Sequence, residues 1–350
     1  MNKRTRVLFA SGLTIAIFLG VQLGALALVE PFESAGYQTV EDPSDPTNSL
    51  VYVGVILVFT AGMLAVIKLG VEWILRAVII LTSGMLSLYV FSVVIPPTVE
   101  VTVGGAPVNV IAWGAAGLVA LALAVYPEWY VIDTAGVVMG AGAAGLFGIS
   151  FGLLPAIILL AVLAIYDAIS VYGTEHMLTL ASGVMDLKIP VILVIPMTLS
   201  YSFLEDTAQA TSEGAVSPGD ESDEAGESNE TGRSDEIVES SGDEESGEPD
   251  ADSGDRDAFF IGLGDAVMPT VLVASAAFFS PAKPLVSGFA LNLPALTAMV
   301  GTLAGLVVLL WMVLKGRAHA GLPLLNGGAI GGYLVGALAS GISLVQAMGL

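Results

Sequence analysis

LLPAIILLAVLAIYDAISVY, residues 153–172, is strongly apolar and contains one carboxylic acid, Asp167. A run of about 20 apolar residues is long enough to cross a bilayer as a helix. A second apolar run, AFFIGLGDAVMPTVLV at residues 258–273, carries Asp265. An ionisable side chain at membrane depth is costly, so an acid inside such a segment indicates a functional site. These two stretches predict a membrane protein built around a pair of acids.

The composition of the 350-residue chain is typical of a polytopic membrane protein. Hydrophobic residues make up 55% of the chain, its mean hydropathy is +0.84, and only 13% of its residues are charged, against roughly 25% in soluble proteins. The absence of cysteine excludes disulfides and thiolate metal sites. The two histidines, His176 and His319, lie in polar flanks. We therefore expect no metal site, no cofactor and no nucleic-acid partner.

Apolar runs of spanning length recur along the chain and predict an all-α protein with nine transmembrane helices. The first run, Val7 to Val29, follows three basic residues but exceeds the roughly 7–15 residues of a secretory signal, so we interpret it as a retained helix. The nine predicted helices cover residues 7–29, 50–69, 72–95, 108–126, 131–149, 153–172, 258–280, 288–314 and 322–345.

The predicted helices divide the chain into three parts. Residues 1–172 form a six-helix membrane part, 173–257 a loop, and 258–350 a three-helix membrane part. Within the loop, the apolar and β-branched segment 189–197 is too short to span a membrane as a helix and favours a strand. The tract 205–257 is rich in Ser, Gly, Glu and Asp. Such a sequence cannot bury enough apolar surface to offset its ordering entropy, so it is predicted to be disordered.

The positions of Lys and Arg predict the orientation, because basic residues gather in cytoplasmic loops. With the N-terminus inside, ten of the 11 basic residues lie on the cytoplasmic side and Lys283 alone lies outside. In the cell membrane, the N-terminus and the 173–257 loop are then cytoplasmic and the C-terminus is outside. The cytoplasmic residues are Lys3, Arg4, Arg6, Lys68, Arg76, Lys188, Arg233, Arg256, Lys315 and Arg317.

Two neighbouring carboxylic acids can share a proton, so that one acts as a base while the other acts as an acid. Such a pair can activate water against a peptide carbonyl and protonate the leaving amine. Asp167 lies about 14 residues into an inward-running helix, and Asp265 about 7 residues into an outward-running one. Both acids are then at similar depth in the cytoplasmic half of the bilayer. Gly262 and Gly264, on either side of Leu263, allow a backbone to approach Asp265 closely.

Three motifs in this arrangement resemble the presenilin and signal peptide peptidase family of intramembrane Gly-x-Gly-Asp aspartyl proteases. They are Tyr166-Asp167 in a sixth helix, Gly262-Leu263-Gly264-Asp265 in a seventh, and a proline at the start of a ninth. The resemblance implies a presenilin-like fold and an intramembrane aspartic endopeptidase in which Asp167 and Asp265 are catalytic. It also implies a role near these acids for Tyr166.

The family's third motif, Pro-Ala-Leu, opens the last helix beside the active site and is linked to substrate specificity. Here that place holds Pro323-Leu324-Leu325, which departs from the motif at its middle position. A literal Pro294-Ala295-Leu296 falls in the predicted eighth helix instead. The resemblance therefore assigns the substrate-binding role to Pro323, Leu324 and Leu325.

The predicted orientation is that of the presenilin-like branch. It implies substrates that are single-span membrane proteins with the N-terminus outside, cleaved within the lipid bilayer. We expect the 189–197 segment to pair as a β-strand with the unwound substrate backbone. A homo-oligomer is compatible with the sequence. Asp133, near the start of a helix, is predicted to be an interfacial residue.

Other functions fit parts of the pattern. Asp167 and Asp265 could be hydrogen-bond partners between helices, or carry ions in an ion- or proton-coupled transporter or channel. Transporters often have duplicated halves with broken helices at matching positions, and the sequence shows no such repeat. A prepilin-type peptidase also uses Gly-x-Gly-Asp, but Tyr166, the nine predicted helices and the Pro323 segment argue against it. A zinc protease is excluded because His-Glu-x-x-His is missing.

Overall fold

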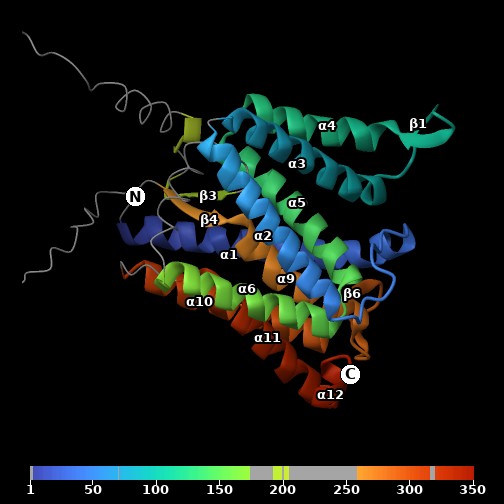
Figure 1. The fold of residues 1–350 in the computed structure, drawn as a ribbon, viewed down its shortest axis with the longest axis vertical. Coiled ribbons are helices and arrows are strands. Elements are labelled where there is room, and N and C mark those ends of the chain that lie inside the picture. The colour runs from blue at the N-terminus through green and yellow to red at the C-terminus, as the bar shows by residue number, and fades with distance from the viewer. Residues whose placement is uncertain (1–2, 70, 174–191, 199–200, 205–257, 316–319) are drawn as a thin grey trace, which may run out of the picture.

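The structure is a computed structural model that describes residues 3–69, 71–173, 192–198, 201–204, 258–315 and 320–350. The predicted disorder of residues 205–257 lies outside the described residues, as do positions 189–191 of the predicted strand. The described residues form a bundle of apolar helices with three short two-stranded sheets at its ends (Figure 1).

Seven of the described helices are long and apolar enough to cross a membrane. Two further apolar helices are shorter, α4 (Val110–Val125) and α9 (Leu263–Phe279), and α12 (Leu344–Ala347) is a single turn. The seven long helices are α1 (Lys3–Ser34), α2 (Thr47–Lys68), α3 (Glu72–Val94), α5 (Trp129–Ser150), α6 (Leu153–Gly173), α10 (Leu293–Val313) and α11 (Gly321–Ala339). The chain is therefore a multi-pass membrane protein, and α4 and α9 are not among its long spans.

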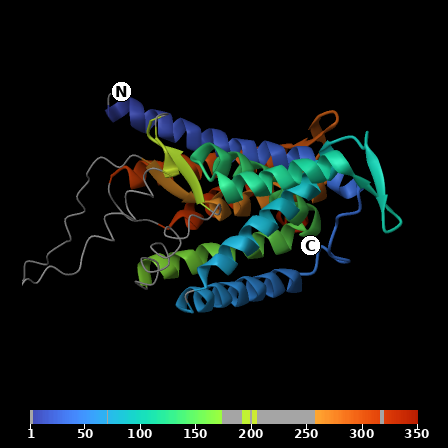
Figure 2. The same ribbon diagram turned by 90° about the horizontal axis from the view of Figure 1, so that it is seen from above.

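The packing distinguishes helices of the core from helices that face outward. α1, α5 and α9 contact one another, and α11 contacts α6, α9 and α10. By contrast, α2 lies at the edge of the bundle, and Val58 and Phe59 on it are each 72% exposed (Figure 2). Apolar exposure on this scale is expected of a helix that faces lipid.

Several predicted helix ends are wrong because short strands precede the helices. The hairpin β1 (Glu100–Val103) and β2 (Ala106–Asn109) leads into α4, and β5 (Pro284–Val286) and β6 (Phe289–Asn292) lead into α10. Glycines with positive φ turn these hairpins, as Gly288 does at φ 75°. Asn292 then accepts the Ala295 N–H and caps α10. The predicted helix 322–345 instead ends at Ala339.

The third sheet joins two segments that are distant in the sequence. β3 (Ile192–Pro196) pairs antiparallel with β4 (Ala258–Gly262), so that Ile192 lies opposite Gly262. This confirms a strand within the 189–197 segment, and it shows that the predicted helix from 258 was wrong at its start. In Figure 1 the sheet lies beside α1, at the end of the bundle away from the β1 hairpin.

Glycines bring the backbones of α10 and α11 into direct contact. An added Cβ on Gly301 would overlap the carbonyl oxygen of Gly328, and one on Gly328 would overlap that of Gly301. Small residues allow this close approach between helices in lipid. The contact between Gly301 and Gly328 holds the middle of α11 against α10.

We expect Gly328→Ala to destabilise the protein, because the added methyl group meets backbone that cannot move aside as a flexible side chain would. A cost of about 1–3 kcal/mol is typical of such overpacking. Gly327→Ala is the matched control, since an added Cβ there has no neighbour within 4 Å. Thermal unfolding in detergent measures the difference, and equal melting temperatures for the two variants would contradict the packing described.

Candidate active site

Asp167 lies near the C-terminal end of α6 and points at the beginning of α11. Its half-buried carboxylate accepts the Leu322 N–H at 3.0 Å through Oδ2, and the neighbouring Gly321 amide also interacts with it. The first N–H groups of a helix have no partner within the helix, and the helix dipole favours negative charge there. Asp167 therefore caps α11 from a different helix.

Asp265 reaches the same place from α9. An ideal Cβ on Gly321 would lie 3.6 Å from Asp265 Oδ2, and one on Gly262 would lie at the same distance from that oxygen. Asp167 binds the amides of the same two residues, Gly321 and Leu322. The structure thus brings the two predicted acids together at the first turn of α11.

The position of Asp265 within its helix differs from the prediction. Because β4 occupies residues 258–262, α9 begins at Leu263 and Asp265 is in its first turn, with Gly262 as the N-cap. The acid is therefore at a helix N-terminus, where negative charge is favoured, and not two turns inside a helix as the sequence predicted. A strand leads directly into it.

The other residues of the predicted Gly-x-Gly-Asp motif have different surroundings. An added Cβ on Gly264 would meet nothing within 4 Å, and Gly264 is exposed, so the backbone before Asp265 is open on that side. Leu263 turns toward α5, where ideal Cβ positions on Gly136 and Gly140 lie 3.6 and 3.3 Å from its Cδ1. Leu263 therefore packs the helix in place.

Two tyrosines of α6 lie near Asp167, of which the sequence predicted only one as a site residue. Tyr166 is 50% exposed. Tyr172, which the sequence did not single out, accepts the Ala320 N–H through its hydroxyl at 3.4 Å. Tyr172 and Asp167 together satisfy backbone donors at the beginning of α11.

Pro323 is in the first turn of α11, directly after Leu322, and so lies next to the two acids. A proline is tolerated there because the first-turn N–H groups have no partner in the helix. Leu324 packs by its carbonyl against Gly305 of α10, and Leu325 is fully buried. Pro294 packs instead against Gly336, near the opposite end of α11. The literal Pro-Ala-Leu sequence is thus remote from the acids.

Asn326 is a second residue that the sequence analysis missed. Its side chain is fully buried, and its Nδ2 donates to the Leu160 carbonyl at 3.0 Å. This bond joins α11 to α6 slightly deeper in the bundle than the bond from Leu322 to Asp167. The two hydrogen bonds, made by Leu322 and Asn326, are about one turn of α11 apart, and together they fix α11 against α6.

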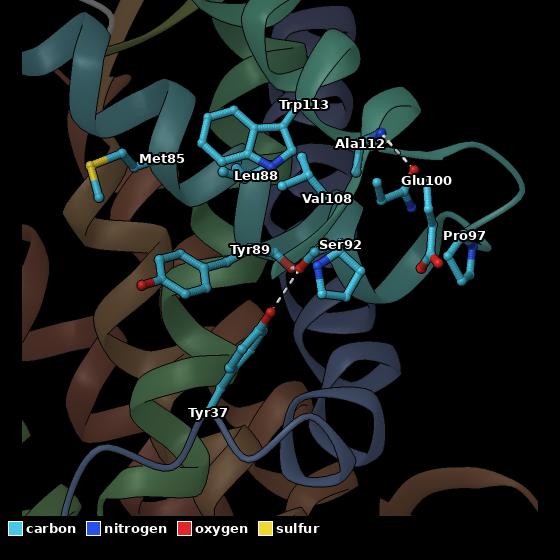
Figure 3. A pocket seen from close by; sticks show the side chains of 12 residues that line it. Tyr37, Met85, Leu88, Tyr89, Ser92, Pro97, Glu100, Val108, Ala112 and Trp113 are labelled. Carbon is cyan, nitrogen blue, oxygen red and sulfur yellow. Dashed lines mark hydrogen bonds between the residues drawn. The ribbon is translucent and has the colours of Figure 1, made fainter. Parts of the chain in front are cut away.

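A hollow of about 470 Å³ lies at the opposite end of the bundle, between α3, α4 and the β1 hairpin (Figure 3). Tyr37 from the loop after α1 points into it and its hydroxyl lies 3.0 Å from that of Ser92. Glu100 is the one acid in its lining. Because it lacks a second acid, this hollow does not offer the paired acid–base chemistry found at Asp167 and Asp265.

No metal-binding group of three or more His, Cys, Asp or Glu residues occurs within the described part of the chain. The chemistry that Asp167 and Asp265 offer is that of two carboxyl groups beside the backbone amides of Gly321 and Leu322. One ionised carboxylate can take a proton from water while a neutral carboxyl group gives one to a leaving group.

Comparisons with known proteins agree with this geometry. Residues 15–342 match the family model described as signal-peptide peptidase, presenilin aspartyl protease. A solved structure titled "Structure of a presenilin family intramembrane aspartate protease in C222 space group" is 32% identical, covers 93% of this chain and 97% of its own, and has a TM-score of 0.59. A second solved structure, of a presenilin family intramembrane aspartate protease in space group P2, is 33% identical. It covers 93% of this chain and 96% of its own, and has a TM-score of 0.58. A search of curated protein sequences gave no match.

Proposed function

The chain belongs to the signal-peptide peptidase and presenilin family of aspartyl proteases, and from this premise we propose that Asp167 and Asp265 are its catalytic residues. The protein is an intramembrane aspartyl protease, a hydrolase that acts on membrane proteins within the bilayer. The observation that carries the proposal is the convergence of both carboxyl groups on Gly321 and Leu322. Nothing in the fold or in the comparisons supports a transporter, a channel or a prepilin-type peptidase.

In the proposed mechanism the two acids share one proton. The ionised member takes a proton from water, which attacks the substrate carbonyl, and the neutral member protonates the leaving amine. The protonation steps belong to the pair, so neither acid has a fixed role at rest. The Leu322 N–H holds one oxygen of Asp167 and supports its charged form. Water and the two acids suffice, so the mechanism uses no cofactor.

We propose that α4 and α9 also cross the membrane, which gives nine spans. A helix of 17 residues such as α9 is about 25 Å long, and β4 extends the chain at its N-terminal end. In Figure 1 the beginning of α1 and the β3–β4 sheet lie at one end of the bundle, and the C-terminus lies at the other. Together with the basic residues, this arrangement supports a cytoplasmic N-terminus and an outside C-terminus. The homo-oligomer remains a prediction.

We propose that the unwound substrate backbone pairs with β4. The sequence had instead suggested the 189–197 segment, which contains β3, as the pairing strand. The Val194 N–H of β3 points away from β4 and donates to Asp133 Oδ1 at 2.9 Å, so the outer edge of β3 is occupied. Phe260 lies opposite Val194, and in such a pair the backbone groups of Phe260 also turn outward. Among the described residues no third strand covers that edge.

An extended substrate strand added to β4 would run directly toward Asp265. Strand addition gains its affinity from backbone hydrogen bonds, so it requires no particular side chain on the substrate. The substrates that this geometry favours are single-span membrane proteins whose helix unwinds near the cytoplasmic surface, with the N-terminus outside. Their unwound backbone groups would find partners on β4 in a setting where unsatisfied groups are costly.

We expect Phe260→Pro to lower kcat/KM for a single-span substrate by about tenfold, because it removes one outward N–H and distorts the edge. Phe260→Ala keeps the N–H and loses the ring that packs against Phe203, so it measures the part of the loss that the ring causes. Both variants are assayed in liposomes at several substrate concentrations. Similar activity of the two variants would show that the open edge of β4 does not bind substrate.

A further inference from the structure

We propose that Glu128, the N-cap of α5, and Asp133 within α5 are positioning residues that fix the register of β3 along β4, the strand that leads to Asp265. The inference rests on the proposed role of the β4 edge in binding substrate. Both acids are buried, with exposed fractions of 5% for Glu128 and 6% for Asp133. Neither is part of the catalytic pair, and both accept hydrogen bonds from the segment that contains β3.

Asp133 lies near the beginning of α5, and its side chain is buried in the bundle. Its place at the membrane interface stays a prediction. Its Oδ1 accepts the Val194 N–H, whereas its Oδ2 has no hydrogen-bond partner among the described residues. Burying a carboxyl group with one oxygen unsatisfied is costly. The bond that Oδ1 accepts from β3 offsets part of this cost.

Glu128 makes the same kind of contact from the beginning of α5. It is the N-cap residue, but its side chain does not cap its own helix. Instead Oε1 accepts the Ser202 hydroxyl at 2.8 Å and Oε2 accepts the Phe203 N–H at 3.1 Å. The carboxylate thus binds a segment more than 70 residues away.

The residues that Asp133 and Glu128 hold are both neighbours of one residue of β4, Phe260. Val194, which Asp133 holds, lies opposite Phe260 in the sheet. Phe203, which Glu128 holds, packs its ring edge-on against the ring of Phe260 at a centroid distance of 6.4 Å. Phe260 is five residues before Asp265 on a continuous strand and helix. Both buried acids therefore act on the strand that leads into the active site.

The register of a short sheet needs such anchors. A slip of two residues between β3 and β4 keeps every side chain on its original face, so apolar packing alone does not forbid it. The bond from Val194 to Asp133 opposes a slip in one direction, because a two-residue slip would bring Pro196, which has no N–H, to the place of Val194. Without it, β3 can slip along β4 and leave β4 a less ordered edge. A substrate strand can pair with such an edge in more than one register, so cleavage would spread along the substrate.

The test uses Asp133→Leu, Asp133→Asn and Thr134→Leu in the full chain, with a single-span substrate in liposomes. We expect Asp133→Leu to raise KM about tenfold and to spread cleavage over sites about two residues apart, as seen by mass spectrometry of the products. Asp133→Asn keeps an acceptor oxygen and should restore the original cleavage site. Thr134→Leu is the control at the next residue, which is exposed.

A cysteine pair makes the test independent of folding defects. The chain has no cysteine, so Val194→Cys with Phe260→Cys forms a single disulfide between facing positions of the sheet. In the Asp133→Leu background we expect one cleavage site when this disulfide is oxidised and several after reduction. Glu128→Ala, tested separately, should spread the sites in the same way.

The outcomes separate this inference from the catalytic assignment. Unchanged KM and an unchanged cleavage site in Asp133→Leu and Glu128→Ala would overturn the inference, while loss of cleavage in Asp265→Asn would still support the catalytic pair. A lower melting temperature with an unchanged cleavage site would show that the acids only stabilise the fold, which also overturns it. If the cysteine pair leaves the sites spread when oxidised, register is not what Asp133 controls.

Discussion

Asp265→Asn is expected to lower the rate of cleavage of a single-span substrate by about 10⁴-fold or more, and Asp167→Asn should do the same. The amide cannot exchange the proton that the pair shares, so the remaining acid loses its partner in both halves of the reaction. A 10⁴-fold loss corresponds to about 5.5 kcal/mol of transition-state stabilisation. Because the acids act as a unit, the double variant should be no slower than either single one.

The measurement compares each variant with the unmodified protein and with Glu33→Gln, which neutralises an exposed acid remote from the site. Melting temperatures in detergent establish that each variant is folded. Cleavage by either Asn variant at more than a few per cent of the original rate would rule out the shared-proton pair. Ion flux in liposomes would then be the next measurement, since it tests the transporter interpretation of the same acids.

The helices around these acids could be predicted from the sequence because long apolar runs have few alternatives in a membrane. Their ends could not, and β4 shows why. Phe259, Phe260 and Ile261 continue the apolar run of α9 without a break, and in a fully apolar run periodicity does not separate strand from helix. The distinction comes from β3, whose pairing with residues 258–262 is a contact between distant parts of the chain.

Some residues of the candidate site could likewise be predicted from the sequence, and others could not. Asp167 and Asp265 stand out in the sequence because charge is rare in apolar runs, and the family resemblance identifies them together. The Leu322 N–H has no such signature, since every residue except proline carries this group. The contact of Asp133 with Val194 could not be predicted, because the two residues are 61 positions apart in the sequence. The position of a residue along a helix does not reveal which other segment of the chain packs over its side chain.

The donor at Leu322 can be removed without changing any charge. We expect Leu322→Pro to lower the cleavage rate by about 10- to 100-fold, because Asp167 would lose the N–H that supports its charged form. Hydrogen bonds to charged groups are worth about 1.5–3 kcal/mol, and that range converts to this loss of rate. A second proline fits here, since Leu322 is in the first turn of α11 and the preceding Gly321 has no Cβ to clash with the ring.

Leu322→Ala is the matched variant because it keeps the N–H and loses most of the side chain. We expect it to stay within about threefold of the original rate, since Leu322 only partly packs against the core and a modest packing loss acts mainly on stability. Rates that fall equally in the two variants would show that the side chain of Leu322 matters and its amide does not. A lower rate for the proline variant alone, at an unchanged melting temperature, would mean that the first turn of α11 holds Asp167 ready for catalysis.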